Sequence, residues 1–400
     1  TIFALAESVQ NAQQIWAASD DGLVHVSTDD GANWRDVTPK QAAKDMQWNS
    51  LEASPFSTDA AYLVGTRYKL GDRTPYLYRT NDRGQSWQLI TRGIAVSHFT
   101  RALRADPARA GLLYVGTERG LYVSEDDGAQ WRALQLNLPL VPITDLALNQ
   151  GDLIAATQGR GFWILDDTTP LTAAAQTDQR SARLFPPRVS YRLETTSDEK
   201  PNAAGRNPAP GTLIYYQLPR VATATDDISL EIQDASGKAI IRYTRKLLPD
   251  EAKAEETKTK VKSVEQDLRV LTGDLGINRF AWNGRYPSPK LFEGLVLWNS
   301  DPTGPKAVPG QYQAVLSFEG IEYKQNFELK ADPRADPRAD PGSKLSVDDF
   351  LAQHKLALQV SEKLTNLHDA IDQLTRFGTA LTVLGERFAK NDTWKVKLDA

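Results

Sequence analysis

The sequence contains no cysteine, and only four histidines occur among its 400 residues. Without cysteine there are no disulfides, no thiolate metal sites and no thiol catalysis. The histidines are scattered along the chain, so neither a metal cluster nor a histidine-based catalytic triad is indicated; they are His25, His98, His354 and His368. The lone Gly159-Arg160-Gly161 has no phosphate-binding context. We therefore expect neither a metal nor a cofactor.

Long apolar runs and blocks of basic residues are missing as well. No run approaches the roughly 20 apolar residues of a membrane span, so we expect no such span. The net charge of −4 and the lack of a basic block argue against nucleic acid as a partner. A chain without cysteine fits a secreted or bacterial envelope protein, although a cytosolic protein can also lack it. The chain opens at Thr1 within a predicted strand, and we expect it to be the C-terminal part of a longer protein.

One eight-residue pattern occurs three times. It runs from Ser27 to Trp34, from Thr80 to Trp87 and from Ser124 to Trp131. Each copy has a hydroxyl residue first, an aspartate two places on, a glycine two places later and a tryptophan three after that. The copies recur about every 50 residues, which indicates a repeat architecture.

Each copy lies between two strand-like runs and is interpreted as a hairpin turn. The aspartate can accept hydrogen bonds from turn backbone N–H groups, and the glycine supplies a positive φ. The tryptophan offers a large apolar face to the neighbouring sheet. We therefore predict structural, not catalytic, roles for Asp29, Trp34, Asp82, Trp87, Asp126 and Trp131.

Residues 1–167 divide into similar units, each interpreted as four short strands, that begin near Ile2, Trp48, Phe99 and Ile143. The fourth unit lacks the repeated pattern. Four strands in a repeat of roughly 45 residues are typical of a β-propeller blade, and propellers have about four to eight blades. We expect a partial propeller whose remaining blades lie on the same gene product or on another chain. An open array capped by the later domain is the less favoured alternative, because it exposes sheet edges.

The rest of the chain changes character twice. Residues 168–212 are interpreted as a crossover and linker, and the short strands that follow, as far as Leu329, predict a β-sandwich. The Glu- and Lys-rich residues 249–268 are interpreted as an exposed loop or a frayed helix. The predicted domains are the propeller blades with the crossover, the sandwich, and a Pro-rich connector with a helical tail, which span residues 1–192, 193–332 and 333–400.

The tail begins after the repeats of Ala-Asp-Pro-Arg, where proline favours an extended connector. Ser346 and Asp349 resemble a capping box, and apolar residues then follow helical spacing to about Thr375. Gly378 is expected to end or interrupt this helix, and residues 379–389 to form a second one. Packing of the helix on its own chain is favoured over binding to a partner.

The repeated pattern resembles the Asp-box of bacterial neuraminidase-type (BNR) repeats, which occur in sialidases, xyloglucan-cleaving hydrolases and the sortilin family. Residues 157–167 resemble the way the propeller ends in large bacterial proteins labelled sortilin-like or BNR-repeat glycosyl hydrolase. Four further segments are similar to the FlgD-like immunoglobulin-type (Ig-type) domain of those proteins: 205–208, 278–282, 285–287 and 308–312. The resemblance implies a mainly β protein, with a partial β-propeller of Asp-box blades followed by an Ig-like β-sandwich and a C-terminal α-helical tail. It also implies a bacterial protein in the extracellular space, the periplasm or the cell envelope.

A ligand site is predicted in the loops at the end of each blade opposite the Asp-boxes. Aromatic and arginine side chains in these loops suit a glycan or a polypeptide, since rings stack and guanidinium groups form paired hydrogen bonds. The candidate ligand-binding residues are Trp48, Arg67, Tyr68, Arg119 and Arg160.

Carboxylates in the same loops leave a hydrolase as an alternative. Glycoside hydrolysis needs two of them facing one another across about 5–10 Å; those available are Asp45, Asp72, Glu118 and Asp145. The arginine cluster and the tyrosine–glutamate pair of a working sialidase are not evident. The favoured function is binding of a glycan or polypeptide, and the alternatives are a glycoside hydrolase acting in the propeller cleft and a structural subunit of a larger assembly.

Overall fold

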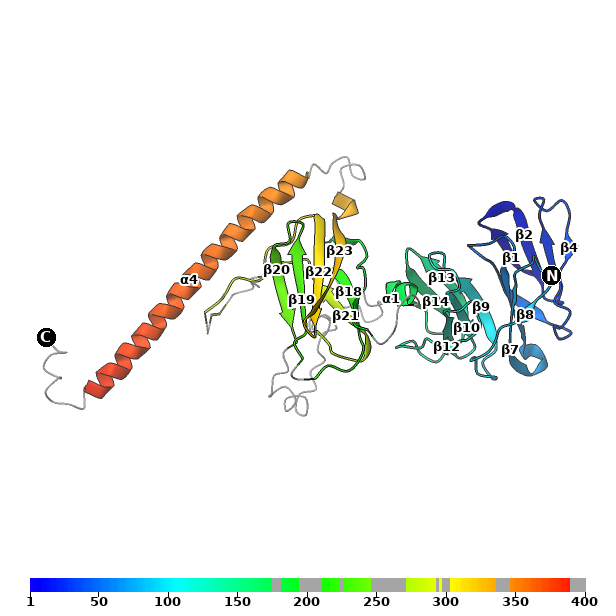
Figure 1. The fold of residues 1–400 in the computed structure, drawn as a ribbon, viewed down its shortest axis with the longest axis horizontal. Helices are drawn as coiled ribbons and strands as arrows, with labels where there is room; N and C mark the ends of the chain where they lie inside the picture. Colours follow the sequence, from blue (N-terminus) through cyan, green and yellow to red (C-terminus); the bar gives the residue numbers. More distant parts are fainter. Residues whose placement is uncertain are drawn as a thin grey trace. The chain divides into compact units, whose positions relative to one another are not determined.

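The computed structural model describes residues 1–174, 181–193, 211–223, 226–245, 271–292, 295–296, 303–335 and 346–388. The chain is mainly β (Figure 1). It divides into two compact units, Thr1–Thr177 and Asp178–Ala400, called here unit 1 and unit 2. The finer division into three domains stays a prediction.

Unit 1 is a succession of antiparallel sheets, and in each of them sequential strands are neighbours. Sheet 1 comprises β1 (Ile2–Ser8), β2 (Asn11–Ser19), β3 (Val24–Ser27) and β4 (Arg35–Asp36). Sheet 2 comprises β5 (Gln47–Ala53), β6 (Ala61–Arg67), β7 (Asp72–Thr80) and β8 (Gln88–Leu89), with the short helix η1 (Tyr68–Leu70) between β6 and β7. Sheet 3 comprises β9 (Thr100–Ala105), β10 (Leu113–Thr117), β11 (Gly120–Ser124) and β12 (Arg132–Ala133). Sheet 4 has the three strands β13 (Ile143–Asn149), β14 (Asp152–Thr157) and β15 (Phe162–Leu165), and the helix α1 (Thr169–Ala174) follows.

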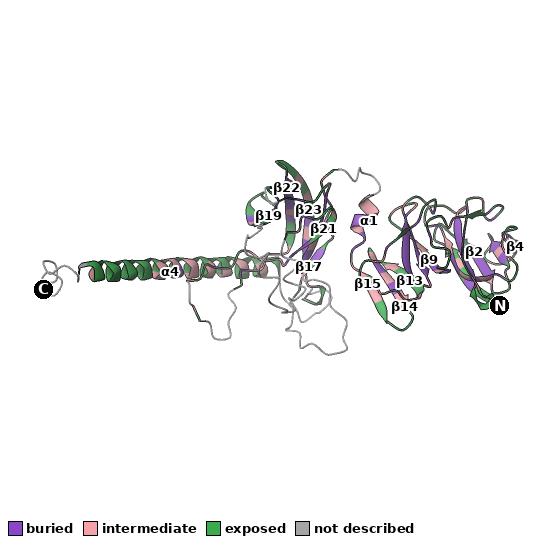
Figure 2. Ribbon diagram, turned by 90° about the horizontal axis from the view of Figure 1, so that it is seen from below, coloured by how far each residue is buried: buried purple, intermediate pink, exposed green. Residues whose placement is uncertain are grey.

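The four units predicted from the repeat therefore correspond to these four sheets. Alternation along each strand gives every sheet two apolar faces, and successive sheets pack face to face. One core lies between sheets 1 and 2, a second between sheets 2 and 3, and a third between sheets 3 and 4. The central strands β6, β10 and β11 are accordingly buried along almost their whole length. Figure 2 shows such buried stretches of unit 1 in purple.

In the described part of unit 2, two sheets enclose one core. The first has the order β16 (Arg183–Leu184), β18 (Thr212–Leu218), β21 (Gly276–Trp282). The second has the order β17 (Ser190–Arg192), β23 (Ile321–Ala331), β22 (Gly310–Phe318), β19 (Ser229–Asp234), β20 (Ala239–Thr244). Aromatic residues fill the space between the sheets; Trp282, for example, contacts Tyr312 and Phe327.

Two short strands correct the boundary predicted at residue 192. β16 pairs with β18, and β17 pairs in parallel with β23, so this stretch of the predicted crossover forms part of the sandwich. Strands of two or three residues carry too little alternation to be recognised in a sequence. The predicted loop over residues 249–268 and the motif at residues 205–208 lie outside the described residues.

One helix, α4 (Val347–Phe388), follows the short helix η2 (Pro333–Ala335) along the chain. Its start confirms the predicted capping box. Ser346 Oγ accepts a hydrogen bond from the Asp349 backbone N–H, and the Asp349 carboxylate accepts one from Ser346. The predicted break at Gly378 is wrong, because α4 continues through it to Phe388. A glycine within a helix costs only about 1 kcal/mol relative to alanine, which a long helix tolerates.

Candidate ligand-binding site

The three Asp-boxes share one set of hydrogen bonds. In the second copy, Thr80 Oγ1 donates to Asp82 Oδ1 at 2.8 Å and accepts from the Gly84 N–H at 2.8 Å. The same carboxylate accepts from the Ser86 N–H at 2.9 Å. The other two copies repeat this pattern at Asp29 and Asp126. These aspartates are occupied by their own turns.

The box tryptophans reach back to the preceding sheet. Trp87 is buried and its Nε1 donates to the Val37 carbonyl at 2.7 Å. Trp131 is also buried and donates to the Ile90 carbonyl at 2.7 Å. Trp34 differs, because it is 44% exposed and its Nε1 donates to Gly31 within its own turn.

The glycines of the second and third Asp-boxes also pack against the preceding sheet, and the glycine of the first does not. A Cβ added to Gly84 would lie 2.6 Å from Val37, and one added to Gly128 would lie 2.5 Å from Ile90. The equivalent Gly31 would meet only its own Trp34, at 3.8 Å. In sheets 2 and 3 the equivalent glycine and tryptophan contact the preceding sheet, whereas Gly31 and Trp34 of sheet 1 contact only their own turn.

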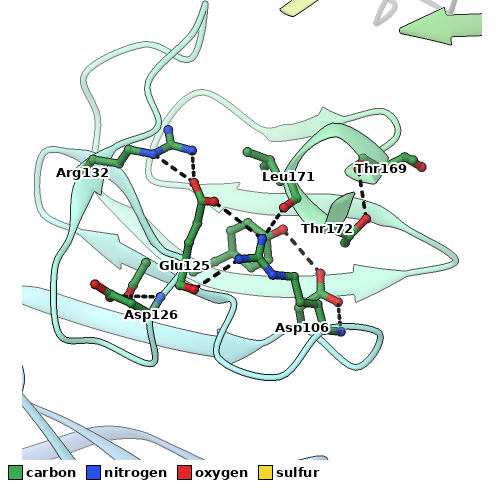
Figure 3. Close-up of polar contacts among 10 residues, drawn as sticks. Asp106, Glu125, Asp126, Arg132, Thr169, Leu171 and Thr172 are labelled. Atoms are coloured by element: carbon green, nitrogen blue, oxygen red, sulfur yellow. Dashed lines mark hydrogen bonds and ion pairs between the residues drawn. The ribbon is translucent and has the colours of Figure 1, made fainter. Parts of the chain in front are cut away.

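A polar cluster at the Asp-box end joins sheet 3 to α1 (Figure 3). Arg109 donates to the Leu171 carbonyl and, at 3.2 Å, to the Glu125 carbonyl. The Glu125 side chain accepts in turn from Arg132 Nη2 at 2.7 Å. Asp106 holds the loop that carries Arg109, since its Oδ1 accepts from the Arg109 N–H at 3.1 Å. The cluster fastens α1 in place.

The same end has a hollow of about 290 Å³ between sheets 2 and 3, and Phe56 is among the residues that line it. On its wall the Asp127 carboxylate accepts hydrogen bonds from the Tyr62 hydroxyl and, at 2.6 Å, from Arg79 Nη1. Burial and the adjacent carboxylate both raise the pKa of Tyr62, so its hydroxyl stays protonated. Tyr62, Arg79 and Asp127 therefore hydrogen-bond to one another along the wall of the hollow.

The opposite end carries an aromatic and arginine platform made of Tyr68, Phe99, Arg101 and Glu118. Tyr68 opens η1, which Gly71 closes at φ 78° with an N–H to the Tyr68 carbonyl. The Tyr68 ring stacks on Phe99 at 5.2 Å between centroids with 6° between the planes. The guanidinium of Arg101 lies 5.1 Å from the Phe99 centroid and 5.8 Å from that of Tyr68.

Burial differs sharply between the members of this platform. Phe99 is buried, whereas Tyr68 is 41% exposed. Arg101 is held by Glu118, whose Oε2 accepts from Arg101 Nε at 2.7 Å. The exposed Tyr68 ring is held in place by Phe99 and Arg101. It can therefore stack on a flat apolar face of a ligand without a further loss of side-chain entropy.

A second ion pair stands next to the platform. Arg67 Nη1 contacts Asp72 Oδ2 at 2.9 Å, and the Tyr76 hydroxyl donates to the same oxygen at 2.7 Å. Partial burial of Asp72 opposes ionisation, but hydrogen bonds from Tyr76, Thr74 and Arg67 outweigh it and lower the pKa of Asp72 to about 2. Asp72 is thus a poor proton donor near neutral pH.

Two of the three other candidate carboxylates are also paired with arginine, while Asp45 is exposed in the loop before β5 with a φ of 57°. Glu118 is bound to Arg101, and Asp145 on β13 accepts from Arg104 Nη2 at 2.9 Å. Arg104 lies in addition 3.7 Å from Glu52, a residue that the sequence did not single out. Burial raises the pKa of Glu52 to about 7, although the charge of Arg104 opposes the shift. Its only signal in the sequence is an acidic residue inside a strand.

Trp48 corrects the prediction that it binds ligand from a loop. It lies within β5, is fully buried, and its ring meets Tyr78 edge-on at 5.8 Å. Gly65 opposite leaves room for it, since a Cβ there would lie 2.7 Å from the Trp48 ring. Trp48 is a core residue between sheets 1 and 2.

The remaining predicted arginines are exposed and lie in loops at this end. Arg119 lies between β10 and β11, and Arg160 lies between β14 and β15. Burial and the charge of Arg119 lower the pKa of His98, whose ring contacts the Tyr122 hydroxyl at 2.9 Å. The structure therefore brings Arg67, Tyr68 and Arg119 to the loops of sheets 2 and 3, and Arg160 to the loop of sheet 4.

Among the described residues, no group of three or more His, Cys, Asp or Glu side chains is placed to hold a metal ion. No helix within the described ranges is both long enough and apolar enough to cross a membrane.

One protein family has a model that matches part of this chain. The Sortilin-Vps10 model, described as "Sortilin, neurotensin receptor 3", matches residues 22–157. That is about a third of the sequence, and it covers the three Asp-boxes. No curated protein matches the chain. The match and the repeated box geometry agree on a propeller-type Asp-box protein.

Solved structures of similar proteins include YCF48 and a glycoside hydrolase. YCF48 from Cyanidioschyzon merolae is 19% identical over 42% of this chain and 53% of its own, with a TM-score of 0.33. YCF48 bound to D1 peptide is 16% identical over 55% of this chain and 66% of its own, with a TM-score of 0.34. The GH74 xyloglucanase from Xanthomonas campestris is 12% identical over 81% of this chain and 45% of its own, with a TM-score of 0.34. The chain thus spans about half to two thirds of the length of the YCF48 structures, and likeness at this level assigns no activity.

Proposed function

We propose that unit 1 is part of an Asp-box β-propeller that binds a glycan or a polypeptide through the loops opposite the boxes. The observation that carries the proposal is the platform, in which the exposed Tyr68 ring stacks on Phe99 and the Arg101 guanidinium lies against both rings. Sugars and peptide side chains both present flat faces to such rings, and Arg67 and Arg119 stand nearby for polar contacts. Arg160 extends the surface onto the last sheet.

Binding is favoured over catalysis because of the state of the candidate acids. A general acid for glycoside cleavage needs a raised pKa near the scissile bond. Asp72 has a pKa of about 2, and Glu118 and Asp145 are each paired with an arginine. These carboxylates are suited to holding arginines in position for a ligand.

One observation favours a second candidate, a glycoside hydrolase. Glu52 has a pKa of about 7, and Arg104 lies between it and Asp145. In such an enzyme Glu52 would donate the proton to the leaving oxygen and Asp145 would act as the base or nucleophile. Release of reducing ends from a polysaccharide, abolished by Glu52→Gln in a folded protein, would favour this candidate over simple binding.

The proposed propeller requires further blades against the outer faces of sheets 1 and 4. Trp34 and Gly31 lack the neighbouring sheet that Trp87 and Trp131 have, and Phe3 and Leu5 are exposed on β1. On β15, Phe162 is 78% exposed, and sheet 4 has three strands where the others have four. An Asp-box blade of the same protein or of another chain would supply the missing carbonyl and apolar contacts.

We further place the protein outside the bacterial cytoplasm, in the extracellular space, the periplasm or the cell envelope. The lack of cysteine and the Sortilin-Vps10 match support this placement. Unit 2 is proposed to be an Ig-like sandwich of the FlgD type, supported by its two packed β-sheets. In this arrangement it is a spacer or assembly module.

Hydrogen–deuterium exchange with a ligand selected from glycan and peptide arrays tests the proposed site. We expect protection in residues 67–73, 97–101 and 117–120. Residues 54–59 and 81–84, at the Asp-box end, serve as the internal control and should not change. Protection confined to the Asp-box end would contradict the proposal and point to the hollow between sheets 2 and 3.

A further inference from the structure

Helix α4 is attached to the sandwich from its N-terminal end as far as Asp372. The His354 ring contacts the Lys306 carbonyl at 2.9 Å, and the Lys290 N–H donates to Thr365 at 3.1 Å. Lys290 also forms ion pairs with Asp369 and, at 3.6 Å, with Asp372. Among the described residues, the polar contacts between α4 and the sandwich end there. The second half is coloured mostly as exposed in Figure 2.

That second half carries an apolar seam with the period of a coiled coil. Leu367, Leu374 and Leu381 are seven residues apart, and Ala370, Phe377 and Leu384 lie three residues after them. This is the a/d spacing of heptads, which places all six on one stripe. They are exposed; Leu374 is 71% and Phe377 64% accessible to solvent.

The seam is complementary to itself in the antiparallel direction. When two copies cross near residues 375–376, Leu374 of each faces Phe377 of the other, Ala370 faces Leu381, and Leu367 faces Leu384. Every a position then meets a d position, as antiparallel helix packing requires. A two-fold axis satisfies all of these contacts at once.

The residues beside the seam place no like charges against one another. Seven of the eight positions that flank the six seam residues are uncharged: Leu364, Asn366, Ile371, Gln373, Gly378, Ala380 and Gly385. The eighth, Arg387, lies beside the uncharged Asn366 of the other copy. The charged residues Asp369, Asp372, Arg376 and Glu386 fall on the outer face. Heterotypic coiled coils select their partner through complementary charges at the flanking positions. The largely uncharged flanking positions of this seam therefore favour a second copy of the chain over a different protein.

We propose that this seam joins two copies of the chain as an antiparallel helix pair. The overlap of three heptads buries on the order of 1,000 Å² in total, which is near the lower limit for a specific interface. We expect the dimer to dissociate in the micromolar range. It presents two copies of unit 1, so that a multivalent ligand is held more tightly than by one copy.

Sedimentation velocity of the whole chain from about 1 to 100 µM tests the dimer. We expect a concentration-dependent dimer that Leu374→Glu/Phe377→Glu weakens at least tenfold. The matched control Thr375→Glu/Thr379→Glu alters neighbouring outer positions and should leave the dimer intact. Far-UV circular dichroism verifies that the helix persists in both variants. A wild-type monomer at all concentrations, or a dimer that the seam variant leaves unchanged, would overturn the proposal.

The absence of cysteine allows a direct test of orientation. Ala370→Cys and Leu381→Cys should form a disulfide with one another when mixed and oxidised, and little with themselves. Self-linked dimers of each single variant would indicate parallel helices and refute the antiparallel register. Seam-dependent binding of the monomer to phosphatidylcholine–phosphatidylglycerol vesicles would instead assign the stripe to a lipid surface and overturn the proposal.

Discussion

The three Asp-box tryptophans provide a matched series within one chain. Trp87 and Trp131 are buried against the preceding sheet, while Trp34 carries the same motif on an open face. Replacing each with alanine changes the same side chain in the same turn. The differences in stability then report what the preceding sheet contributes.

The structure sets the expected magnitudes. Trp87→Ala removes an edge-on contact with Trp16 at 6.2 Å and the hydrogen bond to the Val37 carbonyl. Truncation of a buried tryptophan costs about 3–5 kcal/mol, and Trp131→Ala should fall in the same range. Trp34→Ala removes a side chain that has no sheet to pack on, so we expect about 1 kcal/mol or less.

Urea unfolding of the 400-residue chain measures these free energies, and hydrogen exchange assigns the transition to unit 1. Trp87→Phe separates the ring from the N–H group, and the unpaired Val37 carbonyl should cost about 1–3 kcal/mol. Equal losses from Trp34→Ala and Trp87→Ala would refute the reasoning, because burial against a preceding sheet would then contribute nothing.

Three further changes have defined outcomes. Asp82→Ala should cost about 1–2 kcal/mol, the loss of one or two turn hydrogen bonds, and should leave ligand binding intact in the folded protein; loss of binding would put the site at the Asp-box end. Glu52 binds its proton more tightly in the folded chain, with a pKa of about 7, so its contribution to stability falls as pH rises from about 5 to 8. The free energy of unfolding of Glu52→Gln, relative to that of the wild type, should therefore rise by about 1–3 kcal/mol between about pH 5 and pH 8. If denaturation curves gave the same difference between variant and wild type at both pH values, the pKa shift would be absent. Arg119→Ala and Arg160→Ala should weaken ligand binding about tenfold, or about 1.4 kcal/mol. Asp72→Asn and Glu118→Gln should change binding little, because their amide oxygens can still accept from Arg67 and Arg101. A fluorescence titration in which the amide variants lose more affinity than the arginine variants would contradict this.

Most of the fold of unit 1 could be predicted from local sequence patterns. The hydroxyl–Asp–Gly–Trp pattern fixes each hairpin, and alternation fixes the strands on either side of it. The same alternation explains the error at Trp48, which lies on β5 and joins the core with Met46 and Leu51. The burial of Trp48 depends on Gly65 of the neighbouring strand, and the sequence of β5 by itself does not reveal that contact.

The candidate site is harder to predict from the sequence, because its residues come from different sheets. The position of Tyr68 in a loop is evident from its surroundings. Its partners Phe99 and Arg101 lie about 30 residues away, and only the stacking of sheet 2 on sheet 3 brings them together. The pairing of Glu52 with Arg104 depends on the same stacking.

Isothermal titration with an array-selected glycan or peptide tests the central claim most directly, by comparing Tyr68→Ala with Phe56→Ala. Both remove an exposed aromatic ring, one on the platform and one at the Asp-box end. We expect Tyr68→Ala to weaken binding about tenfold to a hundredfold, or about 1–3 kcal/mol, and Phe56→Ala to leave it unchanged. Loss of binding in Phe56→Ala, with full affinity retained in a folded Tyr68→Ala, would contradict the account.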